Sequence, residues 1–159
     1  MKVSIKKGFG FGLTSGIITT LGLIVGLNSG THSRKVIIGG ILIIAIADAL
    51  SDAFGIHISE ESTTTKIKQR EIWESTISTF LSKLVFALTF VIPILFLELN
   101  IAIIVSIIWG ILLLVSFSFH IAKTQKENPK KVILEHLIIA ILVIAITHLV
   151  GLFVSKVFT

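Results

Sequence analysis

Residues 36–62 read VIIGGILIIAIADALSDAFGIHISEES, an apolar run that is interrupted near its middle by Asp48 and Asp52. On an α-helix, residues four apart share one face, so the two carboxylates would lie one turn apart, roughly 5 to 6 Å at Cβ. An ionised carboxylate at the centre of a bilayer costs at least ~2.5 kcal/mol. A membrane helix with two of them therefore needs a compensating partner, such as a proton, a cation or water. This pattern predicts the ion-binding helix of a membrane transporter, enclosed by the other hydrophobic segments.

The composition of the chain is typical of an integral membrane protein. Of its 159 residues, 53% are hydrophobic and 14% are charged, which is too apolar for a soluble domain. The chain has no cysteine, which excludes structural disulfides and thiolate metal sites. Its net charge of +5 comes from short basic clusters between hydrophobic runs, whereas a nucleic-acid surface needs a continuous basic face. We therefore expect the protein to lie in a lipid bilayer and not to bind nucleic acid.

Five hydrophobic segments are long enough to cross a hydrocarbon core of ~30 Å, which takes about 20 helical residues. The start of the chain resembles a signal peptide, but its apolar run is too long and no A-x-A-like site follows, so we expect a retained first span. Pro93 predicts a kink in the third helix. The fold class is thus an all-α integral membrane protein, one domain with five transmembrane helices in an antiparallel bundle. The expected spans are about 8–28, 36–58, 77–98, 100–121 and 132–155, with residues 59–76 as a short polar extension of the second helix.

The distribution of lysine and arginine predicts the orientation. With a cytoplasmic N-terminus, ten basic residues lie on the cytoplasmic side and three on the other, while Lys83 lies a turn or two inside the third span. Asp48 is then near mid-membrane and Asp52 about 6 Å closer to the cytosol. The small size and the lack of targeting extensions favour a prokaryotic plasma membrane. The ten are Lys2, Lys6, Lys7, Lys66, Lys68, Arg70, Lys123, Lys126, Lys130 and Lys131, and the three are Arg34, Lys35 and Lys156.

Several other polar residues are candidates for the same site. Three hydroxyl groups either complete a metal site or hydrogen-bond to structural aspartates. They belong to Ser15 and Thr19 of the first span and to Ser51. His57 is either a ligand or an interfacial histidine. Four glutamates form either a cytoplasmic entry for cations or a solvated interfacial group: Glu60, Glu61, Glu71 and Glu74.

The glycines of the first span indicate close helix packing. Gly8, Gly12 and Gly16 are four residues apart, as are Gly22 and Gly26. Such small-xxx-small faces let another helix approach closely.

Two stacked carboxylates favour a bound proton, and a divalent cation would displace it. This linkage is the physical basis of an antiporter. The sequence has no nucleophile elbow, P-loop, HExxH or dinucleotide fingerprint, so we expect neither an enzyme nor a cofactor, and the metal ion would be cargo.

Residues 12–27, GLTSGIITTLGLIVGL, and residues 47–59, ADALSDAFGIHIS, resemble the first two spans of the vacuolar iron transporter family, which includes the yeast vacuolar iron carrier. The resemblance implies a five-span dimer with a cytoplasmic N-terminus. It also implies export of ferrous iron, or of manganese, from the cytosol in exchange for protons. The ion path would run between the first two helices of both protomers.

The chain departs from the family pattern at several positions. Ser15 stands where the family normally has an aspartate, Asp52 where it has a methionine, and Asp48 where it has a small residue. Ile56 replaces a family glutamate, and Ile44 a residue that is often acidic. The acidic side chains thus lie on the second helix instead of the first. A carboxylate in place of a thioether makes the site favour manganese, magnesium or iron, bound by oxygen atoms. The cytoplasmic metal-binding helices of the family are reduced to about fifteen residues.

The leading hypothesis is a homodimeric, proton-coupled exporter of Fe²⁺ or Mn²⁺. The alternative is a non-transporting membrane scaffold or assembly protein, with aspartates hydrogen-bonded between helices. A third possibility, a carrier of organic cations, needs aromatic residues around the acids, and only Phe54 is near.

Overall fold

The computed structural model describes residues 2–63 and 67–158, and in those ranges every regular element is a helix. Taken together, α3 and α4 form one candidate span, so five helical segments are long and apolar enough to cross a membrane. The prediction of an all-helical membrane protein with five spans is confirmed. The helices are α1 (Val3–Thr31), α2 (Arg34–Glu61), α3 (Gln69–Thr89), α4 (Val91–Phe96), α5 (Leu99–Gln125) and α6 (Pro129–Phe158).

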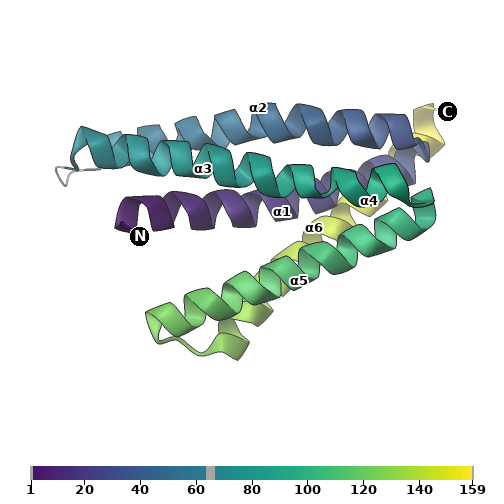
Figure 1. Ribbon diagram of the computed structural model, residues 1–159. Coiled ribbons are helices and arrows are strands. Elements are labelled where there is room, and N and C mark those ends of the chain that lie inside the picture. The colour runs from purple at the N-terminus through teal and green to yellow at the C-terminus, as the bar shows by residue number, and fades with distance from the viewer. Residues whose placement is uncertain (1, 64–66, 159) are drawn as a thin grey trace.

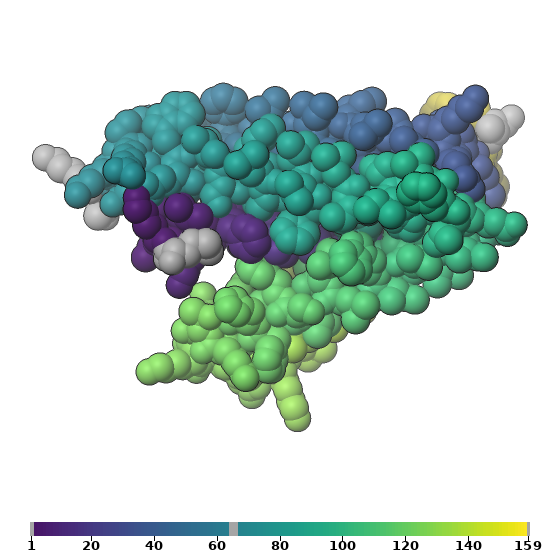
Figure 2. Space-filling view, viewed as in Figure 1, coloured from purple at the N-terminus to yellow at the C-terminus, as the bar shows by residue number. Residues whose placement is uncertain are grey.

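Helix α1 lies in the middle of the molecule and packs against α2, α3, α5 and α6. Figure 1 shows α1, α2 and α3 side by side, while α5 and α6 form a hairpin that diverges from them toward one end. That end carries the N-terminus and the α2–α3 and α5–α6 connections, and we call it the N-terminal end of the bundle. In the space-filling view a notch separates α1 from the α5–α6 hairpin there (Figure 2).

The residues of α1 explain its central position. Leu13, Ile17, Leu21 and Ile24 are buried, at spacings of three and four that form one apolar stripe. A different stripe consists of glycines that face α3 or α6. A Cβ added at Gly8 or Gly12 would come closer than 3.0 Å to the backbone of α3, at Ser75 and Thr79 respectively, and one at Gly22 would meet Val143 of α6. The glycines therefore act in close packing, as the small-xxx-small pattern predicts.

Helix α2 ends earlier than expected. The prediction that residues 59–76 extend it is wrong, because α2 ends at Glu61 and residues from Gln69 onward begin α3. The hydroxyl of Ser62 donates to the carbonyl of Ser59, and that of Thr63 donates to the carbonyl of Glu60. These bonds satisfy the last helical carbonyls and end the helix. Lys66, which the orientation count includes, lies outside the described residues.

The kink expected at Pro93 is confirmed as a break between α3 and α4. Helix α3 ends at Thr89, four residues before the proline, and α4 begins at Val91. Proline has no N–H to donate to the carbonyl four residues earlier, and its ring crowds that carbonyl.

Candidate ion-binding site

The two aspartates of α2 face a lysine of α3. The Nζ atom of Lys83 lies 2.6 Å from Oδ2 of Asp48 and also contacts Oδ2 of Asp52. The Lys83 side chain is only 2% exposed, whereas those of Asp48 and Asp52 are 33% and 21% exposed. We call these three residues the Asp–Lys cluster. It joins carboxylates from consecutive turns of α2 to one ammonium group from α3.

Ser15 completes this cluster from α1. Its hydroxyl donates to Oδ2 of Asp52 over 2.7 Å and accepts from Nζ of Lys83 over 2.9 Å. The neighbouring Gly16 makes this possible, because a Cβ there would lie only 3.1 Å from the backbone oxygen of Lys83. Three helices thus each contribute a polar group to the cluster, beside a close contact between α1 and α3 at Gly16.

The electrostatics of the cluster follow from its composition. With all three groups ionised, two carboxylates against one ammonium leave one net negative charge. Buried ion pairs are costly to form, and the removal of one partner costs about 3–5 kcal/mol because the other charge is left uncompensated. The cluster therefore has an intrinsic affinity for one further positive charge.

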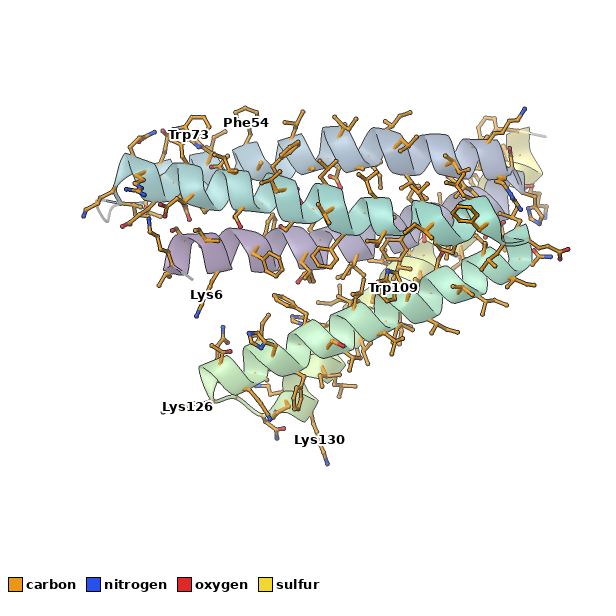
Figure 3. The ribbon with its side chains drawn as sticks, in the orientation of Figure 1. Lys6, Phe54, Trp73, Trp109, Lys126 and Lys130 are labelled. Atoms are coloured by element: carbon orange, nitrogen blue, oxygen red, sulfur yellow. The ribbon has the colours of Figure 1, made fainter. Side chains whose placement is uncertain are left out.

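The other two hydroxyls expected at the site lie differently. Thr19 donates its hydroxyl to the carbonyl oxygen of Ser15, over 2.8 Å, within α1. Ser51 is exposed on the outer surface of α2, away from the buried face of that helix. Phe54 is also exposed and points outward from α2 (Figure 3), so it places no aromatic ring beside the aspartates.

His57 lies one turn beyond Asp52, toward the N-terminal end of the bundle. Its Nδ1 is 2.9 Å from the hydroxyl of Thr76, and its Nε2 is 3.4 Å from a carboxylate oxygen of Glu61. Its ring packs edge-on against Trp73, with 4.7 Å between the ring centroids. These contacts hold His57 in a second polar group, separate from the Asp–Lys cluster.

Glu60 is the most buried of the four glutamates expected at the entry, with 5% of its side chain exposed. It accepts a 2.5 Å hydrogen bond from the hydroxyl of Ser75 and pairs with Nζ of Lys7 at 3.0 Å. Glu60 therefore joins the same three helices as the Asp–Lys cluster, two turns closer to the N-terminal end.

Glu74 and Glu71 lie at the start of α3. Glu74 accepts hydrogen bonds from Lys2 over 2.5 Å, from Ser4 over 2.8 Å and from Arg70 over 3.0 Å. Glu71 is exposed. All four glutamates thus lie at the N-terminal end of the bundle. Three of them contact a basic side chain: Glu60 contacts Lys7, Glu61 contacts His57, and Glu74 contacts Lys2 and Arg70.

The donor set of the cluster is made of oxygens. Within residues 2–63 and 67–158, no group of three or more histidines, aspartates or glutamates is arranged to hold a metal ion. Asp48, Asp52 and Ser15 offer carboxylate and hydroxyl oxygens, which suit hard or borderline divalent cations. The ammonium of Lys83 lies on Oδ2 of both aspartates, so a cation that bound these two atoms together would have to displace it.

Comparison with known proteins gives the family of the chain. A family model described as the VIT family matches residues 56–152, which is more than half of the chain. The chain belongs to the VIT family. Searches of curated proteins and of solved structures gave no match. As a VIT-family member, this multi-pass membrane protein belongs with metal-ion transporters, and the predicted family is confirmed.

The VIT match and the resemblance in the first two spans rest on largely different parts of the chain, which share only residues 56–59. The match begins at Ile56, near the end of α2, and ends in α6. It includes Lys83 but not Ser15, Asp48 or Asp52. The residues before Ile56 and the residues after it therefore point to the same VIT family.

Lys83 is the residue that sequence reasoning missed. The sequence pattern predicts a proton, a cation or water as the compensating partner of the aspartates, and it places Lys83 a turn or two inside the third span without giving it a role. A signal was present, because a lysine inside a membrane span is as costly as an aspartate and needs an acidic partner. Asp48 and Asp52 are the acids deepest within the other spans.

Proposed function

We propose that this chain exports a divalent transition metal, Fe²⁺ or Mn²⁺, from the cytosol in exchange for protons. The observation that carries the proposal is a pair of membrane-embedded carboxylates, Asp48 and Asp52, at the junction of three helices in a VIT-family chain. Intramembrane carboxylates are expensive, and they generally mark ion or proton pathways.

The distribution of charge supports a cytoplasmic N-terminus. The N-terminal end of the bundle carries most of the lysines and arginines, while the opposite end has Arg34, Lys35 and Lys156. Basic residues in short loops remain on the cytoplasmic side. With this orientation the cytoplasmic mouth carries four glutamates: Glu60, Glu61, Glu71 and Glu74.

Lys83 gives the proposed exchange its physical basis. Its ammonium group occupies the position between the carboxylates that a metal ion would need. A metal ion binds both aspartates once the ammonium of Lys83 swings aside. A proton on either carboxylate occupies the same oxygens, so metal and proton compete for them. The residual negative charge of the cluster attracts a proton when no metal is bound.

The chemistry of the donors supports the choice of metal. Carboxylate and hydroxyl oxygens favour Mn²⁺ and Fe²⁺ over softer ions. Asp48, Asp52 and Ser15 leave coordination positions open for water or for a second copy of the chain. The side chain of Asp48 is one-third exposed, beside an apolar outer face of α2, which supports a homodimer that covers this face.

The test is metal flux into proteoliposomes that contain the purified protein and an internal pH dye, with Fe²⁺, Mn²⁺, Co²⁺, Zn²⁺ and Mg²⁺ offered in turn. We expect Fe²⁺ or Mn²⁺ flux with opposing proton movement. Asp48→Asn and Asp52→Asn should each reduce the flux by at least tenfold, because each removes one charge that binds the ion. The matched control is Glu135→Gln, which removes an exposed carboxylate paired loosely with Lys131.

Normal flux in both asparagine variants would contradict the assignment of the site. Flux without proton movement would contradict the coupling but leave the site intact. Folding of each variant is checked by its elution as a single species in detergent.

The alternative function is a non-transporting membrane scaffold, and one observation favours it. Lys83 already pairs with both aspartates, so the cluster is satisfied as a purely structural contact between α2 and α3. A scaffold predicts no metal flux, no stabilisation of the protein by Mn²⁺ or Fe²⁺, and a protein partner that co-purifies. The transporter predicts that Mn²⁺ raises the melting temperature and that Asp52→Asn abolishes this shift.

A further inference from the structure

A cleft lies between the start of α1 and the facing ends of α5 and α6. Its volume is about 610 Å³. It forms because glycines hold α1 against α3 on one side, while near the opposite end of the bundle Gly26 and Gly30 hold α1 against α6. The hairpin therefore meets α1 at one end and diverges at the other, and the notch in Figure 2 is the result.

The floor of the cleft is aromatic. Phe9 packs edge-on against Phe117 of α5, with ring centroids 6.0 Å apart, and Phe117 also reaches Gly10 of α1. Phe11 and Ile121 extend this apolar lining. This apolar lining has the chemistry to hold a hydrocarbon chain.

The rim of the cleft is basic and polar. Lys6, His120, Thr124 and Gln125 line it. Figure 3 shows Lys6 pointing from α1 toward α5. Lys6 forms no ion pair within the described residues, whereas its neighbour Lys7, which also lines the cleft, is paired with Glu60. The rim thus offers a positive charge and hydrogen-bond donors at the end of the bundle where basic residues gather.

We propose that this cleft binds one anionic phospholipid. An acyl chain packs on Phe9, Phe11 and Phe117, and the phosphate lies against Lys6 and His120. The basic rim matches an anionic headgroup, and the aromatic floor matches an acyl chain. Basic pockets between membrane helices recognise acidic headgroups where they open to the leaflet that is rich in anionic lipid. The proposal is independent of metal transport, but it rests on the proposed cytoplasmic N-terminus, which places the cleft in the leaflet rich in anionic lipid.

The experiment is native mass spectrometry of the purified protein in neutral detergent, titrated with phosphatidylglycerol or with phosphatidylcholine of the same acyl chains. We expect one tightly bound phosphatidylglycerol for each chain and weaker binding of phosphatidylcholine. Lys6→Gln should weaken phosphatidylglycerol binding about fivefold, since one lysine near an anionic surface contributes ~1 kcal/mol. Thr124→Trp, at an exposed position on the rim, should block both lipids by filling the cleft.

The matched control is Lys130→Gln, which removes the same charge from the same end of the molecule. Lys130 points away from the cleft in Figure 3, so its replacement should leave lipid binding unchanged. Equal binding of the two lipids, or equal loss in the two glutamine variants, would overturn the proposal. Binding of inorganic phosphate alone as tightly as phosphatidylglycerol would also overturn it, since the acyl chain would then contribute nothing. If Thr124→Trp changed the oligomeric state instead of lipid binding, the cleft would be a contact between copies of the chain.

Discussion

Lys83 makes polar contacts to groups from two other helices while its side chain is almost fully buried. It pairs with Asp48 and Asp52 and donates to Ser15. The ion pair between Lys131 and Glu135 is, by contrast, exposed and 4.0 Å long. Exposed pairs contribute about 0–1 kcal/mol, whereas a broken buried pair costs about 3–5 kcal/mol. The stability of the bundle should therefore depend strongly on Lys83 and weakly on Lys131.

Lys83→Met should lower the free energy of unfolding by about 3–5 kcal/mol, because two carboxylates lose their counter-charge. Adding Asp52→Asn should recover part of this loss, since it removes one of the two uncompensated charges. The measurement is thermal or denaturant unfolding in detergent, with Lys131→Met as the control. Equal stability of Lys83→Met and Lys131→Met would show that the cluster contributes little.

Ser15 and Thr19 form a matched pair of hydroxyls one turn apart on α1. Ser15 contacts the cluster, whereas Thr19 donates to its own backbone. Ser15→Ala should weaken stabilisation of the protein by Mn²⁺ several-fold, because it removes an oxygen beside Asp52 and leaves that carboxylate with one hydrogen bond fewer. Thr19→Ala should have little effect. Metal-dependent melting curves compare the two, and equal effects would exclude Ser15 from the site.

The sequence predicted part of this site. Spacing alone placed Asp48 and Asp52 on one face, and Ser15 was among the candidate partners. Ser51 is exposed, and His57 lies in a separate group with Thr76, because helix rotation is set by packing that the spacing of polar residues does not reveal. To predict the pairing of Lys83 with the aspartates, one must know which residues of α3 lie beside which residues of α2. No local sequence pattern reveals this register.

At the scale of the helices, the close approach of α1 to α3 determines whether the cluster can form. The glycines of α1 let its backbone lie against that of α3, which brings Ser15 within reach of Lys83. Side chains at these positions would separate the two helices.

Gly12→Ala should destabilise the protein and weaken its response to metal. The added Cβ would fall closer than 3.0 Å to the backbone of Thr79, so α3 has to move. Gly55→Ala is the control, because nothing lies within 4 Å of a Cβ there and alanine favours the helix by up to ~1 kcal/mol. Unfolding curves of the two variants provide the measurement. Similar stability for both would contradict the close packing of α1 and α3.

Most element-level features followed from the sequence. Apolar runs gave the five spans, and Pro93 gave the break between α3 and α4. The end of α2 was missed because residues 59–76 have helical periodicity, while the termination depends on the hydroxyls of Ser62 and Thr63 bonding to the last carbonyls.

At the scale of the whole molecule, the five spans place positive charge unevenly at the two ends of the bundle. The orientation can be tested directly because the chain has no cysteine. We expect Lys35→Cys to react with a membrane-impermeant maleimide applied outside intact cells, and Lys126→Cys to react only after lysis. Both positions are exposed, so accessibility differs only by the side of the membrane. The reverse labelling would place the N-terminus outside.

The net charge of the Asp–Lys cluster also bears on how the membrane potential acts on the protein. The empty cluster carries one negative charge, and a divalent ion bound beside a charged Lys83 makes it singly positive. A full crossing of one charge corresponds to ~2.3 kcal/mol per 100 mV. In the proposed export cycle, an interior-negative potential therefore opposes both the outward step of the metal-loaded cluster and the inward return of the empty one. A proton bound on the return step makes the cluster neutral and removes the second of these penalties. Voltage should then slow export chiefly through the metal-loaded step.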